Sequence, residues 1–349
     1  MSGTSMDGVD LSLIKTDGQK IQRCKKNFFL DYKRSTKDAL KRVTSETDFN
    51  KTTLNYLDQI ITDEYIRALE ASNFVNLCEV IGFHGQTLLH VPQEISIQVG
   101  NPKTIANKFR KKIINNFRKN DILNNGQGAP LSPIYHKSII EDLLMPLPAC
   151  FINIGGISNL TYWDGINLFG FDTGPGNCLL DEIVKKYTNE EFDNNGELSL
   201  AGKVNYKEVT KFLDDNFFKL AIPKSLDKLY FKKHLLDIDT NILDLNDKLA
   251  TLSELTVISI INSINSMPNK IKSFCITGGG YKNKYILNKL KNSIDAQFYD
   301  LNSYQISSDY IESEMIAYLS IRRLNELPST FPSTTGVLKP TICGDIYTV

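Results

Sequence analysis

Apolar and polar residues alternate along the first half of the chain in patterns that predict both strands and helices. Residues 9–16 and 21–30 are predicted strands, and the Asp-Gly pair between them is typical of a hairpin turn. In 52–72, apolar residues return at the spacing of a helix. The remaining predicted elements are a helix at 36–45, strands at 79–83, 87–91 and 96–99, a helix at 102–111 and a strand after it. This order predicts an α/β protein.

The same order of elements begins again after the two prolines of MPLPA. A strand at 150–154, a Gly-Gly turn and a second strand at 157–163 precede a third strand that ends in FGFD. A long helix follows, with an apolar residue at every third position from 249 to 264, and a later strand runs through TGGG into a helix at 281–292. Each half therefore starts as strand, glycine turn, strand. We predict two related α/β halves with a ligand-binding cleft between them.

The composition narrows the class of protein. A chain of 349 residues is long enough for two domains of ordinary size. Lysine plus arginine and aspartate plus glutamate each total 40, which argues against a nucleic-acid partner held by broad electrostatics. The six cysteines form no CxxC pair and the four histidines are scattered, so no metal site is predicted from them. With no signal-peptide pattern and no apolar stretch near the ~20 residues that span a bilayer, we predict a reduced, cytoplasmic protein without a membrane partner.

Four glycine-containing segments carry the strongest chemical signal: GTSMDGVD at 3–10, NIGGISNL at 153–160, GFDTGPGN at 170–177 and ITGGGYKN at 276–283. Glycine lets backbone N–H groups approach an anion, and successive N–H groups form concave anion sites. One such segment alone is more often a hairpin turn than a phosphate site. Four of them, each beside a strand end, predict a nucleotide-binding cleft. Neither GxxxxGK[ST] nor GxGxxG after a strand is present, which argues against P-loop and dinucleotide folds.

Asp172 is the carboxylate of greatest interest. It ends a predicted strand and precedes Thr-Gly-Pro-Gly, so it is placed to contact a ligand at the carboxyl end of that strand. A turn aspartate that caps the N–H of Thr173 or Gly174 is an equally good interpretation. A second, mostly neutral group of hydrogen-bonding residues suits the hydroxyls of a sugar. Its members are Gly82, His84, Gln86, Asp121, Gln127 and Gly128. Taken alone, His84 is more often a structural histidine.

Together these motifs resemble those of the anhydro-N-acetylmuramic acid kinases, members of the sugar kinase, Hsp70 and actin superfold. The matching stretches occur in order over nearly the whole chain: MSGTSMDGVD, GFHGQT, IQVGNP, DILNNGQGAPLSPIYH, NIGGISNLT, GFDTGPGN, ITGGGYKN and LPSTFPSTTG. The resemblance implies two ribonuclease-H-like domains that close over ATP, Mg²⁺ and a bicyclic sugar. It also implies that water opens the 1,6-anhydro ring and that O6 is phosphorylated, giving N-acetylmuramic acid 6-phosphate during peptidoglycan recycling.

The resemblance also assigns roles to single residues. Asp172 is the expected catalytic base, and Glu312 is a second expected active-site carboxylate, for which an exposed helix position is an equal alternative. The expected ATP- and phosphate-binding residues are Gly3, Thr4, Ser5, Met6, Asp7, Gly8, Val9, Asp10, Gly155, Gly156, Gly278, Gly279 and Gly280. Asp7 and Asp10 are expected near Mg²⁺. The expected substrate-binding residues are His84, Gln86, Asp121, Gln127, Gly128 and Gly174.

The expected domains are 1–130, with the segment 325–349 packing back on it, and 131–325. The chain departs from the family pattern at three places. The strand that precedes MSGTS in the family is absent, so we expect Met1 to be an internal methionine taken as the start. IPKSLDKLYF stands where PPKSTGREYF is usual, and Glu314 occupies a position that is usually apolar.

Two other functions stay open at this point. A non-catalytic relative would bind sugar or nucleotide without turnover. Another kinase of the same superfold would act on acetate or an ordinary hexose. The expected partner is a small-molecule substrate, with no nucleic acid and no membrane, and a homodimer is left open.

Overall fold

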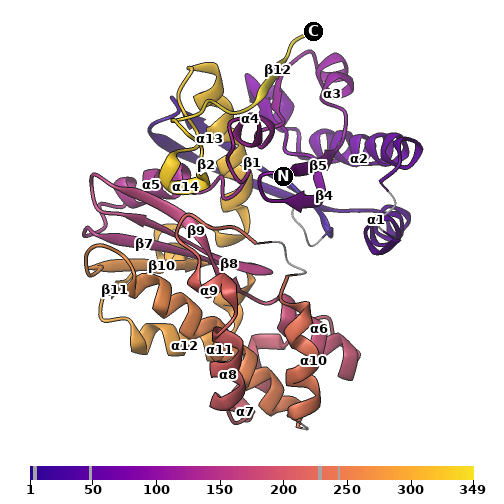
Figure 1. Ribbon diagram of the computed structural model, residues 1–349. Helices are drawn as coiled ribbons and strands as arrows, with labels where there is room; N and C mark the ends of the chain where they lie inside the picture. The colour runs from indigo at the N-terminus through magenta and orange to yellow at the C-terminus, as the bar shows by residue number, and fades with distance from the viewer. Residues whose placement is uncertain (3–5, 47–48, 227–229, 243) are drawn as a thin grey trace. The chain divides into compact units, whose positions relative to one another are not determined.

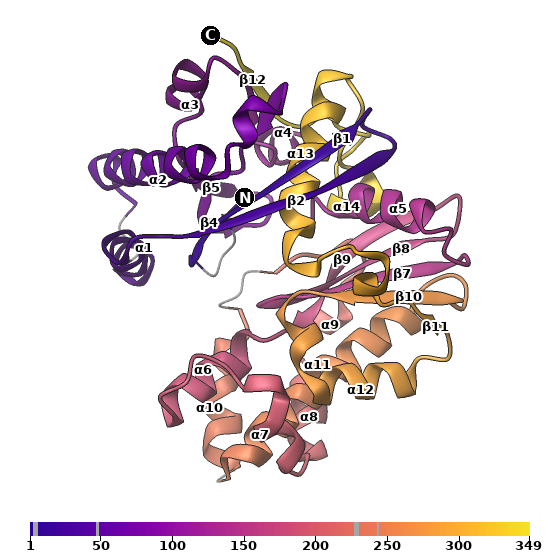
Figure 2. The same cartoon turned by 180° about the vertical axis from the view of Figure 1, so that it is seen from behind.

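The mixed α/β class is confirmed by the computed structural model (Figures 1 and 2). The structure describes residues 1–2, 6–46, 49–226, 230–242 and 244–349. The chain divides into two compact units, each with its own hydrophobic core. Unit 1 comprises 1–142 and 309–349, and unit 2 comprises 143–308.

The limits of these units differ from the predicted domain limits at two helices. α5 (Pro133–Asp142) and α13 (Ile311–Leu324) belong to unit 1, although the sequence placed them in the second domain. The reason is packing: α13 lies against β1 (Gly8–Thr16) and β3 (Val80–Gly82), and α5 lies against β2 (Ile21–Asp31). The apolar spacing of a helix predicts that it has a buried face but does not reveal which element covers that face.

Unit 2 is built on a five-stranded sheet in the order β11-β10-β7-β8-β9. β7 (Ala149–Ile154), β8 (Ile157–Trp163) and β9 (Leu168–Pro175) form an antiparallel meander. β10 (Ser273–Thr277) pairs parallel to β7, and β11 (Gln297–Phe298) pairs parallel to β10. This is the ribonuclease-H-like order that the resemblance implied. Because β7, β9 and β10 run the same way, their carboxyl ends meet at one edge of the sheet.

Helices complete the core of unit 2. α11 (Leu245–Asn265) packs on β8 and β9, and α12 (Lys284–Ser293) packs beside it (Figure 1). The predicted stripe of α11 is buried at Leu249, Leu252 and Leu255. The further helices are α6 (Cys178–Tyr187), α7 (Glu197–Ala201), α8 (Tyr206–Leu213), α9 (Asn216–Lys219) and α10 (Lys232–Asn241), with 3₁₀ turns η2 (Asn194–Gly196), η3 (Gly279–Lys282) and η4 (Leu301–Tyr304). The 3₁₀ turn η5 (Ser308–Tyr310) begins at the last residue of unit 2 and continues into unit 1.

Small sheets form the strand part of unit 1. β1 and β2 make an antiparallel hairpin, as the Asp-Gly turn predicted. β3 and β6 (Lys112–Asn115) pair in parallel, and β12 (Asp345–Tyr347) adds antiparallel to β6, which brings the C-terminal segment onto unit 1. β4 (Gln86–Val91) pairs with β5 (Ile95–Val99).

The first two residues of the chain lie between β1 and β4. Met1 exchanges two backbone hydrogen bonds of 2.8 Å with Asp10, one in each direction. Ser2 forms a parallel bridge with Gln86, and its hydroxyl hydrogen-bonds to Tyr65. Within the residues that the structure describes, no ladder joins β1 to β3. The backbone of Met1 and Ser2 therefore connects the hairpin to β4.

The core of unit 1 is covered by α2 (Lys51–Ser72), which confirms the helix predicted at 52–72. Asn50 caps this helix by accepting the N–H of Thr53. The further unit 1 helices that the structure describes are α1 (Arg34–Glu46), α3 (Pro102–Phe109), α4 (Lys119–Leu123) and α14 (Pro332–Thr335), with the 3₁₀ turn η1 (Phe74–Asn76). No described helix of either unit is long and apolar enough to cross a membrane.

His136 of α5 links the fold to a pH dependence of stability. The residue is buried, and burial lowers its pKa from 6.5 to about 3. In the unfolded chain this histidine therefore takes up a proton near pH 6.5, whereas in the folded chain it stays neutral until the pH is near 3. His136 contributes stability above pH 6.5 that is lost, by about 1.4 kcal/mol per pH unit, as the pH falls below that value.

We predict that His136→Gln weakens this dependence. Between about pH 7 and about pH 5.5, the free energy of unfolding should fall by about 1 kcal/mol more in the wild type than in the variant. Urea titrations followed by far-UV circular dichroism measure both losses. Equal losses in the two proteins would show that this histidine does not set the pH dependence.

Candidate active site

Three of the predicted glycine turns come together at the edge of the unit 2 sheet where β7, β9 and β10 end. The N–H of Gly176, after β9, donates to the carbonyl of Gly156 at 2.9 Å. The side-chain amide of Asn177 donates to the carbonyl of Ile154, at the end of β7, at 3.2 Å. A Cβ on Gly278, after β10, would lie 2.6 Å from the same carbonyl oxygen. The turns thus pack directly on one another, as parallel strand ends in one sheet require.

These turns differ in whether the fold itself requires glycine. A Cβ on Gly176 would lie 2.3 Å from the Gly155 carbonyl oxygen, and a Cβ on Gly280 would lie 2.3 Å from Cγ2 of Ile154. Packing therefore excludes side chains at both positions. A Cβ on Gly155 or Gly156 would meet nothing closer than 3.6 Å, and neither residue has a positive φ. The fold therefore does not itself require glycine at these two positions, and the expected role of Gly155 and Gly156 in phosphate binding stays a prediction.

Asp172 is buried in β9 and is held by the segment that follows Pro223. Its Oδ2 accepts the N–H of Leu226 at 2.7 Å and the hydroxyl of Ser225 at 3.2 Å. Its own N–H donates to the Lys224 carbonyl at 2.8 Å. Burial lowers the pKa of Lys224, and the charge of Asp172 opposes this change. The sequence did not reveal these partners, because Leu226 lies 54 positions after Asp172.

The altered part of the family motif, Asp227, Lys228 and Leu229, lies outside the described residues. The same holds for the first three residues of the phosphate segment, Gly3, Thr4 and Ser5.

Asp172 also belongs to a row of polar side chains that crosses the sheet. In the strand register, Asn159 of β8 stands opposite Asp172 on one side and Asn153 of β7 on the other. Asn153 in turn stands opposite Thr277 of β10, whose hydroxyl donates to the Asn153 Oδ1 at 3.2 Å. The buried Oδ1 of Asn159 has no hydrogen-bond partner among the described residues. An unpaired acceptor thus lies beside the expected base, and only the strand register reveals it.

The opening segment, expected to bind the ATP phosphates, contributes to the core of unit 1. Met6 and Val9 are buried among its apolar side chains. A Cβ on Gly8 would lie 2.4 Å from the Leu30 carbonyl oxygen, so this glycine is required by the pairing of β1 with β2. The side chains at positions 6 and 9 therefore have structural roles, and phosphate binding by this segment stays a prediction.

Asp7 and Asp10, expected near Mg²⁺, lie near other carboxylates of unit 1. The pKa of Asp10 is raised to about 6, chiefly by burial, with the charges of Asp7, Glu312 and Asp309 adding to the rise and the N-terminal ammonium opposing it. Glu312, in the first turn of α13, reaches solvent, but the surrounding protein raises its pKa while Arg118 opposes the rise. Mg²⁺ takes oxygen ligands, commonly one or two carboxylates together with phosphates. These residues fit that chemistry, although the described residues contain no group of three metal-ligating side chains.

His84 and Arg118 lie at the centre of the predicted sugar-binding group of unit 1. The Nδ1 of His84 lies 3.0 Å from the Gly85 carbonyl oxygen, which can only accept, so Nδ1 carries the proton. Its Nε2 then accepts from Nη2 of Arg118 at 3.3 Å. Burial, together with the charge of Arg118, lowers the pKa of His84 to about 3, so the ring is neutral. Gln86 is also buried, and its Oε1 accepts the hydroxyl of Tyr32 at 3.2 Å.

Asp121 of α4 and the loop residues Gln127 and Gly128 are tied to one another and to α14. The two carboxylate oxygens of Asp121 accept the hydroxyl of Thr335 and the N–H of Gly128, each at 2.6 Å. The N–H of Gln127 donates to the Thr335 carbonyl at 2.7 Å, and Nη1 of Arg118 donates to the Gly128 carbonyl at 2.7 Å. Asp121 thus shapes the loop, and its contact with substrate stays a prediction.

The sequence and the structure group two residues differently. Gly174, predicted to bind substrate with residues of unit 1, belongs to unit 2, where a Cβ would lie 3.0 Å from Oγ of Ser259 on α11. Arg118 was not singled out, although it contacts both His84 and Gly128. Its one signal in the sequence is its place three positions before Asp121, and neighbouring lysines and arginines hide that signal.

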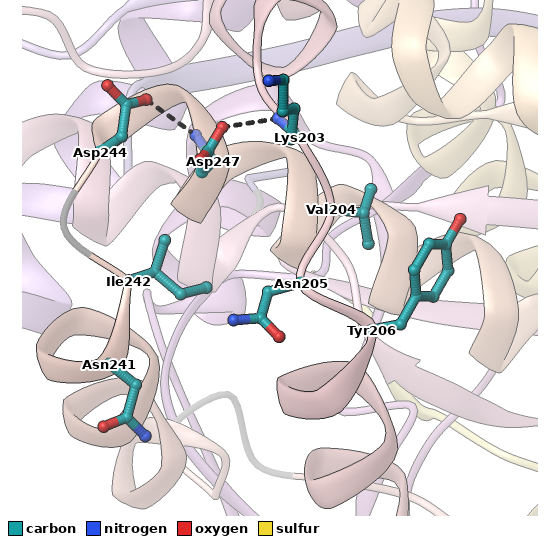
Figure 3. Close-up of a pocket in the computed structure, with 8 residues that line it drawn as sticks. All are labelled: Lys203, Val204, Asn205, Tyr206, Asn241, Ile242, Asp244 and Asp247. Atoms are coloured by element: carbon teal, nitrogen blue, oxygen red, sulfur yellow. Dashed lines mark hydrogen bonds between the residues drawn. The ribbon is translucent and has the colours of Figure 1, made fainter.

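A separate hollow of about 570 Å³ opens on unit 2 and is lined by none of the predicted site residues (Figure 3). Its lining consists of Lys203, Val204, Asn205, Tyr206, Asn241, Ile242, Asp244 and Asp247. The Asp244 carboxylate caps α11 by accepting the N–H of Asp247, and Asp247 accepts the N–H of Lys203 at 2.6 Å (Figure 3). Both carboxylates are therefore engaged in holding the backbone.

The fold and the site agree with the sugar kinase, Hsp70 and actin superfold: a ribonuclease-H-like sheet brings open glycine turns to one edge beside an oriented carboxylate. The family model "Anhydro-N-acetylmuramic acid kinase" matches residues 1–349, and the chain belongs to this family.

Relatives match the chain over nearly its whole length. It is 37% identical over 366 residues to the anhydro-N-acetylmuramic acid kinase of Pelagibacter ubique, with 99% of this chain and 96% of that protein covered. It is 34% identical over 362 residues to that of Rhodopseudomonas palustris, with 99% and 98% covered. Among solved structures, component A of the (R)-2-hydroxyglutaryl-CoA dehydratase of Acidaminococcus fermentans is 12% identical, with a TM-score of 0.42 and 90% of this chain and 95% of that chain covered.

Gly176 and Gly156 provide a matched pair of substitutions. Gly176→Ala should destabilise unit 2 by about 1–3 kcal/mol, because its Cβ meets a backbone carbonyl. Gly156→Ala should change the free energy of unfolding by less than about 1 kcal/mol. It should nevertheless weaken ATP binding about tenfold, or by about 1.4 kcal/mol, because the methyl group enters the open space. Fluorescence of Trp163, the single tryptophan, during urea unfolding and calorimetric titration with ATP measure the two effects.

Unchanged ATP affinity in a folded Gly156→Ala variant would contradict the assignment of this turn to a phosphate. Equal destabilisation by the two substitutions would contradict the conclusion that a side chain has room at Gly156 but not at Gly176.

Proposed function

We propose that this protein is an ATP-dependent kinase that converts 1,6-anhydro-N-acetylmuramic acid to N-acetylmuramic acid 6-phosphate. The observation that carries the proposal is the convergence of the open Gly155-Gly156 turn and the buried Asp172 at one edge of the unit 2 sheet. Such a convergence suits a reaction between a phosphate chain and a proton acceptor. Membership of the kinase family over 1–349 supplies the identity of the two substrates.

In the proposed reaction, water adds to the anomeric carbon C1 of the sugar while the bond between C1 and O6 breaks. Asp172 accepts the proton that this water loses. O6 keeps the electron pair of the broken bond and forms a bond to the γ-phosphorus of ATP. The bond from that phosphorus to the β,γ-bridging oxygen breaks, ADP leaves, and the proton passes from Asp172 to solvent.

Asp172 suits the role of base because its position is fixed. Leu226 and Ser225 hold its Oδ2, and its N–H is bound to the Lys224 carbonyl. A base held in one orientation does not lose rotational freedom when water binds beside it. Proton transfer to a positioned group of this kind typically contributes about 10²–10⁴-fold to the rate.

The phosphates and the metal complete the proposed nucleotide site. The backbone around Gly155 and Gly156 would bind phosphate oxygens, and the turn at Gly278–Gly280 would support the adenosine. Asp7 and Asp10 would hold Mg²⁺, which when bound neutralises negative charge on the transferring phosphate.

The sugar is proposed to bind through the polar group of unit 1. Neutral side chains such as His84 and Gln86 can hydrogen-bond to its hydroxyl and amide groups. The guanidinium of Arg118 supplies the positive charge that an acidic sugar requires, and it is oriented by its bonds to His84 and Gly128. Because peptidoglycan fragments are reused inside the cell, we place the reaction in the cytoplasm. A homodimer and the lack of a nucleic-acid partner stay predictions.

Replacing Asp172 by Asn tests the role of the base. The amide keeps the shape and an acceptor oxygen but cannot take up a proton, so kcat should fall about 10²–10⁴-fold with KM for ATP little changed. A coupled assay of ADP release with the anhydro sugar and Mg²⁺-ATP measures both constants. Asp214→Asn removes a carboxylate of the same unit that is 80% exposed, and this matched control should keep the wild-type kcat.

The same assay, together with calorimetric measurement of sugar binding, separates the proposed kinase from the alternative functions. Full activity of Asp172→Asn would exclude this residue as the base. Wild-type protein that binds the sugar in calorimetry but releases no ADP would be a non-catalytic relative. Preferred turnover of acetate or an ordinary hexose would identify a different kinase of the superfold.

A further inference from the structure

Arg23, on β2, joins α5 and α13 in a largely buried cluster of unit 1. Its Nε donates to Oε2 of Glu314 on α13 at 3.0 Å, and its Nη1 donates to Oδ2 of Asp142, the last residue of α5, at 3.0 Å. Tyr135 of α5 donates its hydroxyl to the same Oε2 of Glu314. The side chains of Arg23 and Glu314 are only 12% and 6% exposed. These four residues are called the arginine cluster below.

The arginine cluster explains how the chain accommodates a carboxylate at position 314, where the resemblance leads us to expect an apolar residue. Burial and the charge of Glu314 hold the pKa of Tyr135 well above its usual value, so its hydroxyl keeps the proton that it donates. Burial lowers the pKa of Arg23, but Tyr135 and Glu314 more than offset this and keep the guanidinium charged. Glu314 therefore has two directed donors on one oxygen.

A gain in stability alone is a weak explanation for the buried ion pair of Arg23 and Glu314. Removing two charges from water costs several kcal/mol per ion, and the attraction between them only about balances that cost. Well-packed apolar residues at the same positions are often as stabilising or more so. The distinctive property of the arginine cluster is its directionality, because planar Arg and carboxylate groups fix each other's orientation.

The arginine cluster acts on the helical turn that carries Glu312. Ser313, between Glu312 and Glu314, bonds through its hydroxyl to that of Ser12 on β1 at 2.6 Å. Residues two apart on a strand share a face, so Asp10 lies on the same face of β1 as Ser12. The first turn of α13 is thus tied to β1 by Ser313 and to β2 by the arginine cluster. Figure 2 shows α13 crossing this hairpin.

The arginine cluster also joins the two places where the chain passes between the units. The chain leaves unit 1 after Asp142 and returns at Asp309, shortly before Glu314. Arg23 binds both Asp142 and Glu314, so one guanidinium within unit 1 fixes the end of α5 and the start of α13 together.

We propose that Arg23 is a positioning residue for the reaction, which fixes the first turn of α13 through Glu314 and thereby sets the orientation of Glu312. This inference rests on the proposed function and deepens it, because it adds a residue of β2 that none of the recognised motifs contains.

Rate measurements on Arg23→Leu test the proposal. We expect kcat to fall about 10- to 100-fold with KM for ATP within about twofold of the wild type, because small displacements of an active-site group have effects of this size. Lys37→Leu breaks an exposed ion pair with Asp31 of the same unit, and as a matched control it should keep the wild-type kcat.

A paired replacement separates positioning from stability. Arg23→Leu/Glu314→Leu removes both charges and leaves neither buried alone, so its thermal unfolding midpoint should equal or exceed that of the wild type. Its kcat should stay about 10-fold or more below the wild type, because the directed tie between β2 and α13 is lost. Wild-type kcat in this paired variant would overturn the proposal, since the ion pair would then serve stability alone.

A double-mutant cycle tests whether Arg23 acts through Glu312. In a Glu312→Gln background, Arg23→Leu should lower kcat by less than about twofold. The same fold-loss in both backgrounds would overturn the proposal, because the two residues would then act independently.

Hydrogen–deuterium exchange gives a readout that does not need activity. Arg23→Leu should speed amide exchange across 311–316 relative to the wild type and to Lys37→Leu. Unchanged exchange there would overturn the role of Arg23. Absence of turnover by the wild type would count against the proposed function, and the exchange result would still decide whether the arginine cluster holds this turn.

Discussion

The central position of β7 in the unit 2 sheet is the constraint on which the proposed nucleotide site depends. β10 pairs with β7 in parallel and β9 runs in the same direction, so the chain delivers three turns to the edge where β7 ends. The contacts there are short: Gly176 bonds to Gly156, and Asn177 bonds to Ile154. Because these bonds hold the surrounding backbone, the open space at Gly156 is a preformed feature, and a bound phosphate would not have to order the turn.

Unit 1 is organised by the attachment of α13 to the β1–β2 hairpin. This helix carries Glu312, while the hairpin carries Asp10, and the two carboxylates are close enough that the charge of Glu312 helps to raise the pKa of Asp10. Arg118 and the N-terminal ammonium are positive groups that act on the same region, and Arg118 is oriented by His84 and Gly128. The carboxylates proposed to hold Mg²⁺ therefore lie within reach of one another's charge, and Glu312 lies within reach of the charge of Arg118. A cation bound there would relieve the repulsion between these carboxylates.

The sequence predicted the elements that have a local residue pattern. It did not predict the contacts that form only when distant segments pack together. The hairpin turn, the helix at 52–72 and the glycine turns beside strand ends each have such a pattern, and the structure contains them. Arg118 and Lys224 were not singled out, because the contacts that Arg118 makes with His84 and Lys224 makes with Asp172 join residues far apart in the sequence. The limits of the two units differ from the predicted domain limits because tertiary contacts, which the sequence does not reveal, place α13 against β1 and β3. Glu314 was recognised only as unusual, since the sequence does not show that Arg23 and Tyr135 lie around it.

Analysis of the reaction product tests the central claim most directly. Wild-type protein is incubated with 1,6-anhydro-N-acetylmuramic acid and Mg²⁺-ATP, and the mass and phosphorylation site of the product are determined. The account predicts a sugar that has gained one phosphate and one water, with the phosphate on O6 and the anomeric carbon bearing a hydroxyl group. Tandem mass spectrometry distinguishes this product from its isomers. A sugar that gained phosphate but no water, or one recovered without any phosphate, would contradict the account.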